Sequence, residues 1–345
     1  MVNDFSRRTF LKTTALAVGG AAVPDVPVRA QQSVPSEAQR DPNSRQQERG
    51  IRLRTVGIMS PGDMGSAVGQ VLAQHGLTVI AALGERSART HALAAEAGIA
   101  DVGTLENLVR EADLVMSILD PDAAIVAAQR VAEAMKSAGA TPLYADCNSI
   151  AVQSARKVSE IMQAVGAPFA EASIIGAPPR VPNKTRIYAS GPHAQDFAQL
   201  NQFGLNVRIL GPEEGKAKAI KICYATVTKG TQALFTESFV SAKRLGVFDV
   251  LTTELETSQK ALLKFAQDGL QQMPPKAHRW VGEMNELAAT YQGIGLTPRM
   301  LAGAADMYRD VSQTTLGHES PENQRKLGRS FDEFIVMLER DMPRG

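Results

Sequence analysis

Short apolar runs alternate with longer amphipathic segments along residues 52–210. The runs Thr55–Met59, Leu77–Ala82 and Asp113–Leu119 are mostly hydrophobic at successive positions, which is typical of parallel strands buried on both faces. Between them hydrophobic residues recur at helical spacing, first from about Asp63 to Gln74. This alternation predicts an α/β Rossmann-type domain with a doubly wound parallel sheet. Further runs at Pro142–Asp146, Phe169–Ser173, Thr185–Ser190 and Asn206–Leu210 predict its remaining strands.

From residue 211 onward the pattern is helical. It predicts an all-α C-terminal domain over 211–316 and a helical extension over 317–345 that could pack on a partner subunit. The first segment runs from Lys216 to about Leu245, and Gly246 is suited to ending it. A helix of about 30 residues is long for a globular protein and needs packing along its length. We therefore expect it to join two domains or to lie in the interface of a homodimer.

The turn after the first strand carries the first candidate chemistry. Backbone N–H groups at a helix N-terminus have no partner within the helix, and together with the helix dipole they favour a phosphate group. Gly62 would let the backbone approach a pyrophosphate, and Gly65 would let the helix pack closely on the strand. Ser60 replaces the first glycine of the usual fingerprint, so an ordinary strand–turn–helix unit is the alternative. The predicted dinucleotide-binding residues of this turn are Ser60, Pro61, Gly62, Asp63, Met64 and Gly65.

Residues beyond the second strand bear on the choice between NAD and NADP. An acidic residue there would accept hydrogen bonds from the ribose 2′-hydroxyl of NAD, whereas arginine accommodates the 2′-phosphate of NADP. Arg86, Ser87 and Arg89 cluster there and favour NADP, while Glu85 favours NAD. In the alternative interpretation Ser87 caps a helix and both arginines face water.

Polar residues also follow the central strands. Ligands of open parallel sheets bind beyond the carboxyl ends of the strands. Leu119 and Asp120 follow one such strand, and Asn148 and Ser149 follow the next. We expect Leu119, Asp120 and Asn148 to line a nicotinamide pocket. Each could instead belong to a helix cap, and for Ser149 the cap is the better interpretation.

The N-terminus resembles an export signal. Ser6–Lys12 contains a twin-arginine pair and precedes a mildly apolar segment, Thr13–Val23, and a candidate cleavage site at Val28–Ala30. We expect a twin-arginine signal peptide over residues 1–30, a disordered linker over 31–51, and a periplasmic protein exported in its folded state with cofactor bound. The alternative is a basic leader without export, which would leave the protein in the cytoplasm.

Composition narrows the function classes. The formal net charge of the 345 residues is +1, so neither nucleic acid nor an anionic membrane surface is an expected partner. The sequence has no apolar run of about 20 residues, which argues against a membrane-spanning helix. The five histidines lack metal-site spacing. Cys147 and Cys223 are interpreted as two buried thiols, and a disulfide between them stays open as an alternative.

The turn Ser60–Gly65 is similar to the Gly-x-Gly-x-Met-Gly turn of the β-hydroxyacid dehydrogenases. That family includes 6-phosphogluconate dehydrogenase, 3-hydroxyisobutyrate dehydrogenase and the imine reductases. The resemblance spans roughly Arg52 to Gln313. It implies a dinucleotide-binding domain followed by a helical domain, with the active site in the cleft between them.

A second motif of this family lies near the start of the long helix. Lys221–Tyr224, with Gly215 before it, resembles Gly-x-Gly-x-x-x-Lys-x-x-Asn, although Ala217 and Tyr224 replace the second glycine and the asparagine. The resemblance implies that Lys221 is the catalytic proton donor or acceptor. Tyr224 and Thr228 would orient the substrate from the same helix face. A lysine is also a common solvent-facing residue, and Lys216, Lys218 and Lys229 are expected only at the surface or against phosphate.

Ile174–Arg180 occupies the place of the family's Asp-Ala-Pro-Val-Ser-Gly-Gly substrate motif. Gly176 matches that motif and would leave room for a substrate, whereas Ile175 and Ala177 replace its serine and second glycine. Loss of the serine hydroxyl argues against a β-hydroxyacid substrate and indicates a less polar pocket.

His278–Asn285 contains the only tryptophan, Trp280. The family brings a Lys-Asp pair to the active site from the corresponding helix, and Gly282 and Glu283 are the approximate equivalents here, so the lysine is absent. The region resembles an uncharacterised C-terminal domain that often follows NAD-binding domains of the 6-phosphogluconate dehydrogenase type. The alternative for Trp280 and His278 is packing in the core of an interface.

These features predict an NADP-dependent oxidoreductase, with NAD as the second choice, that transfers hydride between nicotinamide and the carbon of a carbonyl or imine in a small substrate. One alternative is an imine or enamine reductase. The other is an exported dinucleotide-binding protein without turnover.

Overall fold

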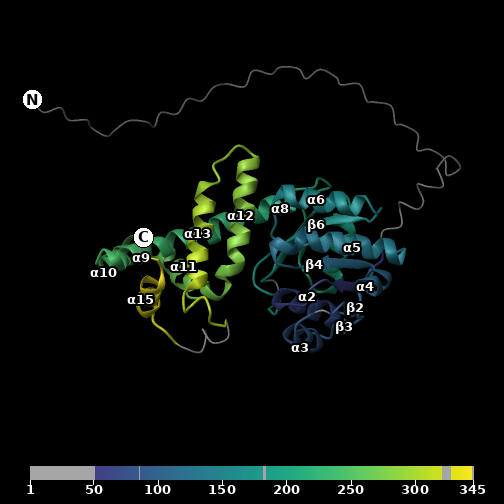
Figure 1. Cartoon of the computed structure of the whole chain (residues 1–345), viewed down its shortest axis with the longest axis horizontal. Helices are drawn as coiled ribbons and strands as arrows, with labels where there is room; N and C mark the ends of the chain where they lie inside the picture. The colour runs from purple at the N-terminus through teal and green to yellow at the C-terminus, as the bar shows by residue number, and fades with distance from the viewer. Residues whose placement is uncertain (1–50, 85, 182–183, 321–327, 344–345) are drawn as a thin grey trace, which may run out of the picture. The chain divides into compact units, whose positions relative to one another are not determined.

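The computed structural model describes residues 51–84, 86–181, 184–320 and 328–343. The expected signal peptide, nearly all of the linker, and Glu85 lie outside the described residues. Within the described residues a single sheet occupies the first part of the chain, and helices form the remainder (Figure 1).

Eight strands form the sheet: β1 (Thr55–Ile58), β2 (Thr78–Ala81), β3 (Ala100–Asp101), β4 (Leu114–Ser117), β5 (Leu143–Asp146), β6 (Phe169–Ile175), β7 (Arg186–Ser190) and β8 (Val207–Ile209). Their order is β3-β2-β1-β4-β5-β6-β7-β8, and all neighbours are parallel except β6 and β7. The predicted Rossmann-type sheet is confirmed, except that β7 runs antiparallel to β6. Strands β4, β5 and β6 are buried along their whole length, which explains their continuous apolar runs.

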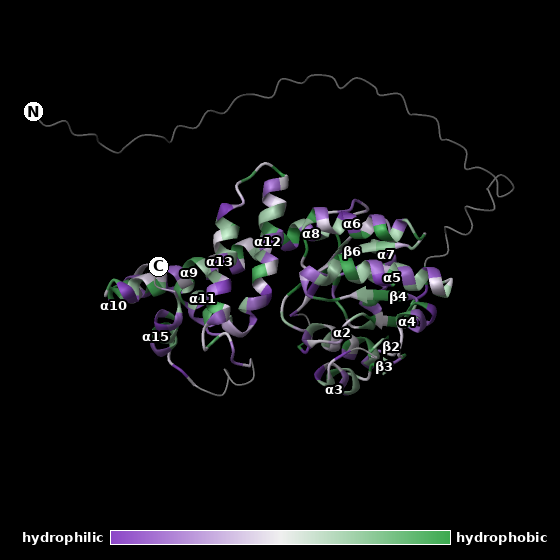
Figure 2. Cartoon of the chain, in the orientation of Figure 1, coloured by the Kyte–Doolittle hydropathy of each residue, from purple (hydrophilic) through white to green (hydrophobic). Residues whose placement is uncertain are grey.

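Two hydrophobic layers cover opposite faces of the sheet, because strand side chains alternate in direction. Leu114 and Met116 of β4 face one layer, and Val115 between them faces the other. Strand residues are predominantly hydrophobic, whereas the covering helices carry both classes of residue (Figure 2). The first layer contains α2 (Asp63–Gln74), α3 (Ala88–Glu96), α7 (Ala194–Phe197) and the 3₁₀ segment Ala198–Phe203; the second contains α4 (Leu105–Glu111), α5 (Ala124–Ala138) and α6 (Val152–Gln163).

The long helical segment is confirmed in extent but is not one regular α-helix. It comprises α8 (Lys216–Ala225), a π-helical turn (Thr226–Gly230) and α9 (Thr231–Arg244). Gly246, with φ +73°, follows its end. The π turn changes the angular register between α8 and α9, and such turns occur frequently at functional sites.

The remaining helices pack around α9 and one another. They are α10 (Phe248–Ser258), α11 (Lys260–Leu270), α12 (Ala277–Gly293), α13 (Arg299–Gln313) and α15 (Phe331–Asp341). Phe239 of α9 meets Phe248 and Phe331 edge-on, with ring centroids 5.9 and 5.3 Å away. The C-terminal helix α15 packs on α9 of the same chain. No helix in the described ranges is both long and apolar enough to cross a membrane.

Candidate functional site

The turn between β1 and α2 has the geometry of a phosphate-binding turn. Gly62 is the N-cap of α2, and a Cβ added to it would meet no atom within 4 Å. A Cβ at Gly65 would lie well under 3.0 Å from the carbonyl oxygen of Ser60. Gly65 is therefore required for the helix to approach the strand, and Gly62 leaves the ligand side of the turn open. Pro61, between Ser60 and Gly62 in the same turn, is buried.

Asp63, the first residue of α2, places a carboxylate beside this turn, where phosphate would be repelled. The structure pairs it with Arg180, whose guanidinium donates to Asp63 Oδ1 at 2.9 Å. Both side chains are largely exposed, so the pair contributes little to stability but neutralises the acid.

A cavity of about 650 Å³ lies next to the same turn, on the side of β2. Arg86 lines it and donates from Nη2 to the carbonyl oxygen of Met59 at 3.0 Å. Ser87 instead caps α3 and accepts a hydrogen bond from the Thr90 amide at 3.3 Å. Arg89 is exposed on α3. Of the three residues predicted for the NADP phosphate, Arg86 alone lines this cavity. Ser87 caps a helix, as the alternative interpretation expected.

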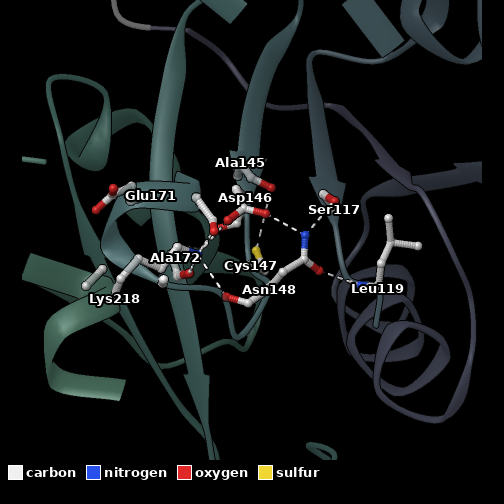
Figure 3. Close-up of polar contacts among 12 residues, drawn as sticks. Ser117, Leu119, Ala145, Asp146, Cys147, Asn148, Glu171, Ala172 and Lys218 are labelled. Carbon is white, nitrogen blue, oxygen red and sulfur yellow. Dashed lines mark hydrogen bonds and ion pairs between the residues drawn. The ribbon is translucent and has the colours of Figure 1, made fainter. Parts of the chain in front are cut away.

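The ends of β4 and β5 are joined by a buried polar network (Figure 3). The Asn148 amide donates to Ser117 Oγ at 2.9 Å and to Asp146 Oδ1, and its oxygen accepts the Leu119 amide at 2.6 Å. Because its polar atoms are engaged in this way, Asn148 holds the sheet edge in place rather than projecting into a pocket. Leu119 is half-buried at this edge, and Asp120 is exposed.

Lys221 reaches the carboxyl end of the sheet from α8. Its ammonium donates to the carbonyl oxygen of Ile174 at 2.8 Å, and the side chain is partly buried. Burial lowers the pKa of Lys221 to about 8; Glu283 opposes that shift, and the cations Lys229 and Lys218 add to it. Both protonation states of Lys221 are therefore accessible near neutral pH.

Tyr224 and Thr228 are the two residues that were predicted to orient a substrate beside Lys221. Tyr224 is 46% exposed. Thr228 lies in the π turn, and its hydroxyl donates to the Tyr224 carbonyl at 3.0 Å. In the part of the chain that the structure describes, the Lys221 ammonium has no hydrogen bond to either residue. Lys221 and Tyr224 lie three residues apart within the regular helix α8, whereas Thr228 falls in the π turn that follows it.

Lys229 and Glu283 form the second charged centre of the site. They make an ion pair, and Lys229 also lies 4.8 Å from the centroid of the Trp280 ring. Ser149 Oγ donates to Glu283 Oε1 at 2.9 Å, which links α12 to the end of β5. Burial raises the pKa of Glu283, but Lys229, Lys221 and the hydrogen bonds outweigh it and hold the pKa below its usual value. Glu283 is thus a buried, ionised carboxylate.

The expectation that Lys216, Lys218 and Lys229 lie at the surface holds only for Lys216, which is half-exposed and paired with Glu213 at 2.7 Å. It is wrong for Lys218, which is fully buried, and for Lys229, which is mostly buried. Residue type alone could not reveal this, because partners for both ammonium groups come from distant elements.

Gly282, at the approximate place of the family's lysine, lies on α12 close to the Asp122 carboxylate. A Cβ there would lie 2.9 Å from Asp122 Oδ1, in the 3₁₀ turn Pro121–Ala123 that follows β4. A side chain at position 282 would therefore require the exposed Asp122 carboxylate to move.

Gly176 is required by the backbone conformation at this position. Its φ is +126°, and a Cβ would lie 2.5 Å from the carbonyl oxygen of Lys184. The glycine therefore lets the chain double back between β6 and β7.

The two cysteines differ from the prediction of two buried thiols. Cys147 is buried and Cys223 is exposed, and both are free. Burial raises the pKa of the Cys147 thiol to about 12, so it is unreactive at neutral pH. No cluster of three or more His, Cys, Asp or Glu side chains in the described ranges is arranged to hold a metal ion.

Comparisons with known proteins match both halves of the chain. Residues 55–203 match the family model of the NAD binding domain of 6-phosphogluconate dehydrogenase. Residues 242–311 match a domain of unknown function, DUF1932. Residues 55–203 are therefore an NAD binding domain of the 6-phosphogluconate dehydrogenase type, and the two matches together agree with the domain order of the β-hydroxyacid dehydrogenase superfamily. The resemblance of the Ser60–Gly65 turn is thereby confirmed, as is that of the C-terminal domain around Trp280.

The individual proteins that this chain resembles are distant from it in sequence. An uncharacterized 28.5 kDa protein from Methanothermus fervidus is 23% identical over 259 residues, 75% of this chain and 99% of the relative. A solved protein of unknown function with structural similarity to 3-hydroxyacid dehydrogenases is 27% identical, with a TM-score of 0.57 over 77% of this chain and 100% of that one. The 3-hydroxyisobutyrate dehydrogenase of Mycobacterium tuberculosis shares the fold at 18% identity, with a TM-score of 0.60 over 81% and 100% of the two chains.

Proposed function

We propose that this protein is an NADP-dependent oxidoreductase in which Lys221 donates or accepts the proton of the reaction. The observation that carries the proposal is the placement of Lys221. It is partly buried at the carboxyl end of β6, held by the Ile174 carbonyl, and its pKa is lowered to about 8. A group with this pKa can give up or take up a proton at neutral pH, as general acid–base catalysis requires.

The turn and the adjacent cavity fit a dinucleotide. Gly62 leaves an open face at the N-terminus of α2, and Arg86 lines a cavity on the adenosine side of the turn. Gly62 and Gly65 would admit the pyrophosphate, and Arg86 would contact the 2′-phosphate of NADP. The bound nicotinamide would supply or accept the hydride. The chain's own residues orient the reactants and handle the proton.

The polar groups around Lys221 support a carbonyl or imine substrate without a carboxylate anchor. Glu283 already neutralises Lys229. Ile175, at the place of the family's substrate serine, is buried and apolar. Imine or enamine reduction is therefore the second candidate, because it does not need the missing hydroxyl.

These candidates are separated by following NADPH absorbance with small aldehydes, ketones and cyclic imines, and NADP⁺ reduction with 3-hydroxyacids. Turnover of imines alone supports the second candidate. A protein that binds the dinucleotide but turns over none of these classes fits the exported binding protein instead.

We also propose that the protein is a periplasmic homodimer exported by the twin-arginine route. Ile220, Val227 and Leu234 leave apolar side chains exposed along α8, the π turn and α9, and Leu234 is 70% exposed. Such a row fits a second copy packed on the long helix. Analytical ultracentrifugation of wild type and Leu234→Glu tests the dimer, and cell fractionation of Arg7→Lys/Arg8→Lys tests export.

A further inference from the structure

Strand β6 extends beyond its neighbour β5. The parallel register ends at Asp146 opposite Glu171, while β6 continues to Ile175. Two lysines of α8, one helical turn apart, bind carbonyls of this overhang. Lys218 Nζ donates to Ala172 O, and Lys221 Nζ donates to Ile174 O, each at 2.8 Å. Helix α8 thus supplies, through two side chains, donors that a neighbouring strand would otherwise offer.

Lys218 is the more deeply placed of the two, with no solvent exposure. Its ammonium pairs with Asp146 Oδ2 at 2.7 Å and donates to the carbonyl oxygens of Asp146 at 2.9 Å and Asn148 at 3.0 Å. Figure 3 shows Lys218 directed from α8 into the ends of β5 and β6. Burying two charges is expensive, and apolar residues of similar size often replace such pairs without loss of stability. Stability alone is therefore a weak reason for this pair to exist.

The pair is continuous with the cofactor edge of the sheet. Asp146 receives Lys218 on one carboxylate oxygen and the Asn148 amide on the other. Asn148 in turn accepts the backbone amide of Leu119, at the end of β4. A continuous series of polar contacts, an ion pair followed by two hydrogen bonds, therefore runs from α8, through β5, to the loop where nicotinamide is expected.

We propose that Lys218 is a positioning residue that fixes the nicotinamide end of the cofactor site, through Asp146 and Asn148, in register with Lys221 on the next turn of α8. The inference rests on the proposed dinucleotide function. It assigns Lys218 no contact with substrate or cofactor. Lys218 also acts on Lys221 through its charge, which is one of the causes that lower the pKa of Lys221.

The test compares a whole dinucleotide with its adenosine fragment. NADPH spans both ends of the site, whereas 2′,5′-ADP reaches only the adenosine end. Binding of each to full-length protein is measured by calorimetry, for wild type and for the double variant Lys218→Met/Asp146→Asn, which removes both buried charges together. Lys216→Met is the matched control, since Lys216 is an exposed lysine on the same helix. Circular dichroism establishes that each variant is folded.

The double variant should bind NADPH roughly tenfold more weakly while its affinity for 2′,5′-ADP stays within about twofold of wild type. Equal weakening of both ligands, or no weakening of either, overturns the positioning role. If the double variant does not fold, Asn148→Ala, which cuts the series after the ion pair, should give the same split. If wild type binds neither NADPH nor NADH, the proposed function fails and this inference fails with it. If wild type binds NADPH, the change in affinity of the variants for the two ligands tests the positioning role of Lys218 alone.

Discussion

The Lys221 ammonium lies 2.8 Å from the carbonyl oxygen of Ile174, the penultimate residue of β6. This hydrogen bond fixes a titratable amine at the sheet edge where a nicotinamide is expected. The carbonyl can accept an N–H from either the charged or the neutral amine. Lys221 can therefore change protonation state without losing its anchor.

Lys221→Met should lower turnover by about a hundredfold or more, since the general acid or base is removed. Affinity for NADPH should change little, because the turn Ser60–Gly65 and Arg86 are untouched. Steady-state kinetics and calorimetry on the same preparations check both statements. Lys216→Met serves as the control. Parallel loss of turnover and of NADPH affinity would instead make Lys221 a structural or cofactor-binding residue.

The pH dependence of turnover should report the lowered pKa of Lys221. Reduction needs the protonated ammonium, so its rate should fall as pH rises through about 8; oxidation needs the neutral amine, so its rate should rise over the same range. Glu283 favours the charged form, so Glu283→Gln should move the midpoint to lower pH. Glu213→Gln, which alters an exposed acid paired with Lys216, should leave the midpoint in place. A midpoint that moves upward in Glu283→Gln contradicts the electrostatic account.

The two glycines of the β1–α2 turn should respond differently to alanine. Gly65→Ala introduces a Cβ against the Ser60 carbonyl and should lower the free energy of unfolding by about 2 kcal/mol or more. Gly62→Ala meets no protein atom within 4 Å and should keep its melting temperature. It should nevertheless weaken NADPH binding, because the methyl group enters the space expected for the pyrophosphate. Unchanged NADPH affinity in a folded Gly62→Ala protein would place the phosphates elsewhere.

Arg86→Met should weaken NADPH binding roughly tenfold or more and NADH binding much less, since the guanidinium would contact the phosphate that only NADPH carries. Arg110, which is exposed on α4 and bonded to Asn107, provides the control substitution Arg110→Met. Similar losses for both dinucleotides would indicate that Arg86 supports the turn through Met59 rather than choosing the cofactor.

Local pattern was sufficient for most of the fold. Apolar runs marked the strands because both faces of this sheet are buried, and the glycines of the first turn marked a close helix–strand approach. Strand β3 was not predicted, since two exposed residues make no apolar run. The antiparallel direction of β7 was also unpredicted, because direction depends on how the chain returns after Gly176.

The site was predicted less completely, for a physical reason. Lys221 was identified through a motif, but the burial of Lys218 and the pairing of Lys229 with Glu283 depend on contacts between distant elements. On the sequence, Lys216, Lys218 and Lys229 look alike. One signal was available for Asp146: an acid at the buried end of a strand needs a buried partner. The π turn that contains Thr228 had no signal in its composition.

The central claim is that the protein binds a nicotinamide dinucleotide, and the most direct test is mass spectrometry of the small molecules released on denaturation. Full-length protein is loaded with NADP and NAD in equal amounts, passed through a desalting column and then denatured. We predict release of NADP in a near-stoichiometric amount, with little NAD. Release of NAD alone would contradict the role given to Arg86, and release of neither dinucleotide would contradict the oxidoreductase account itself.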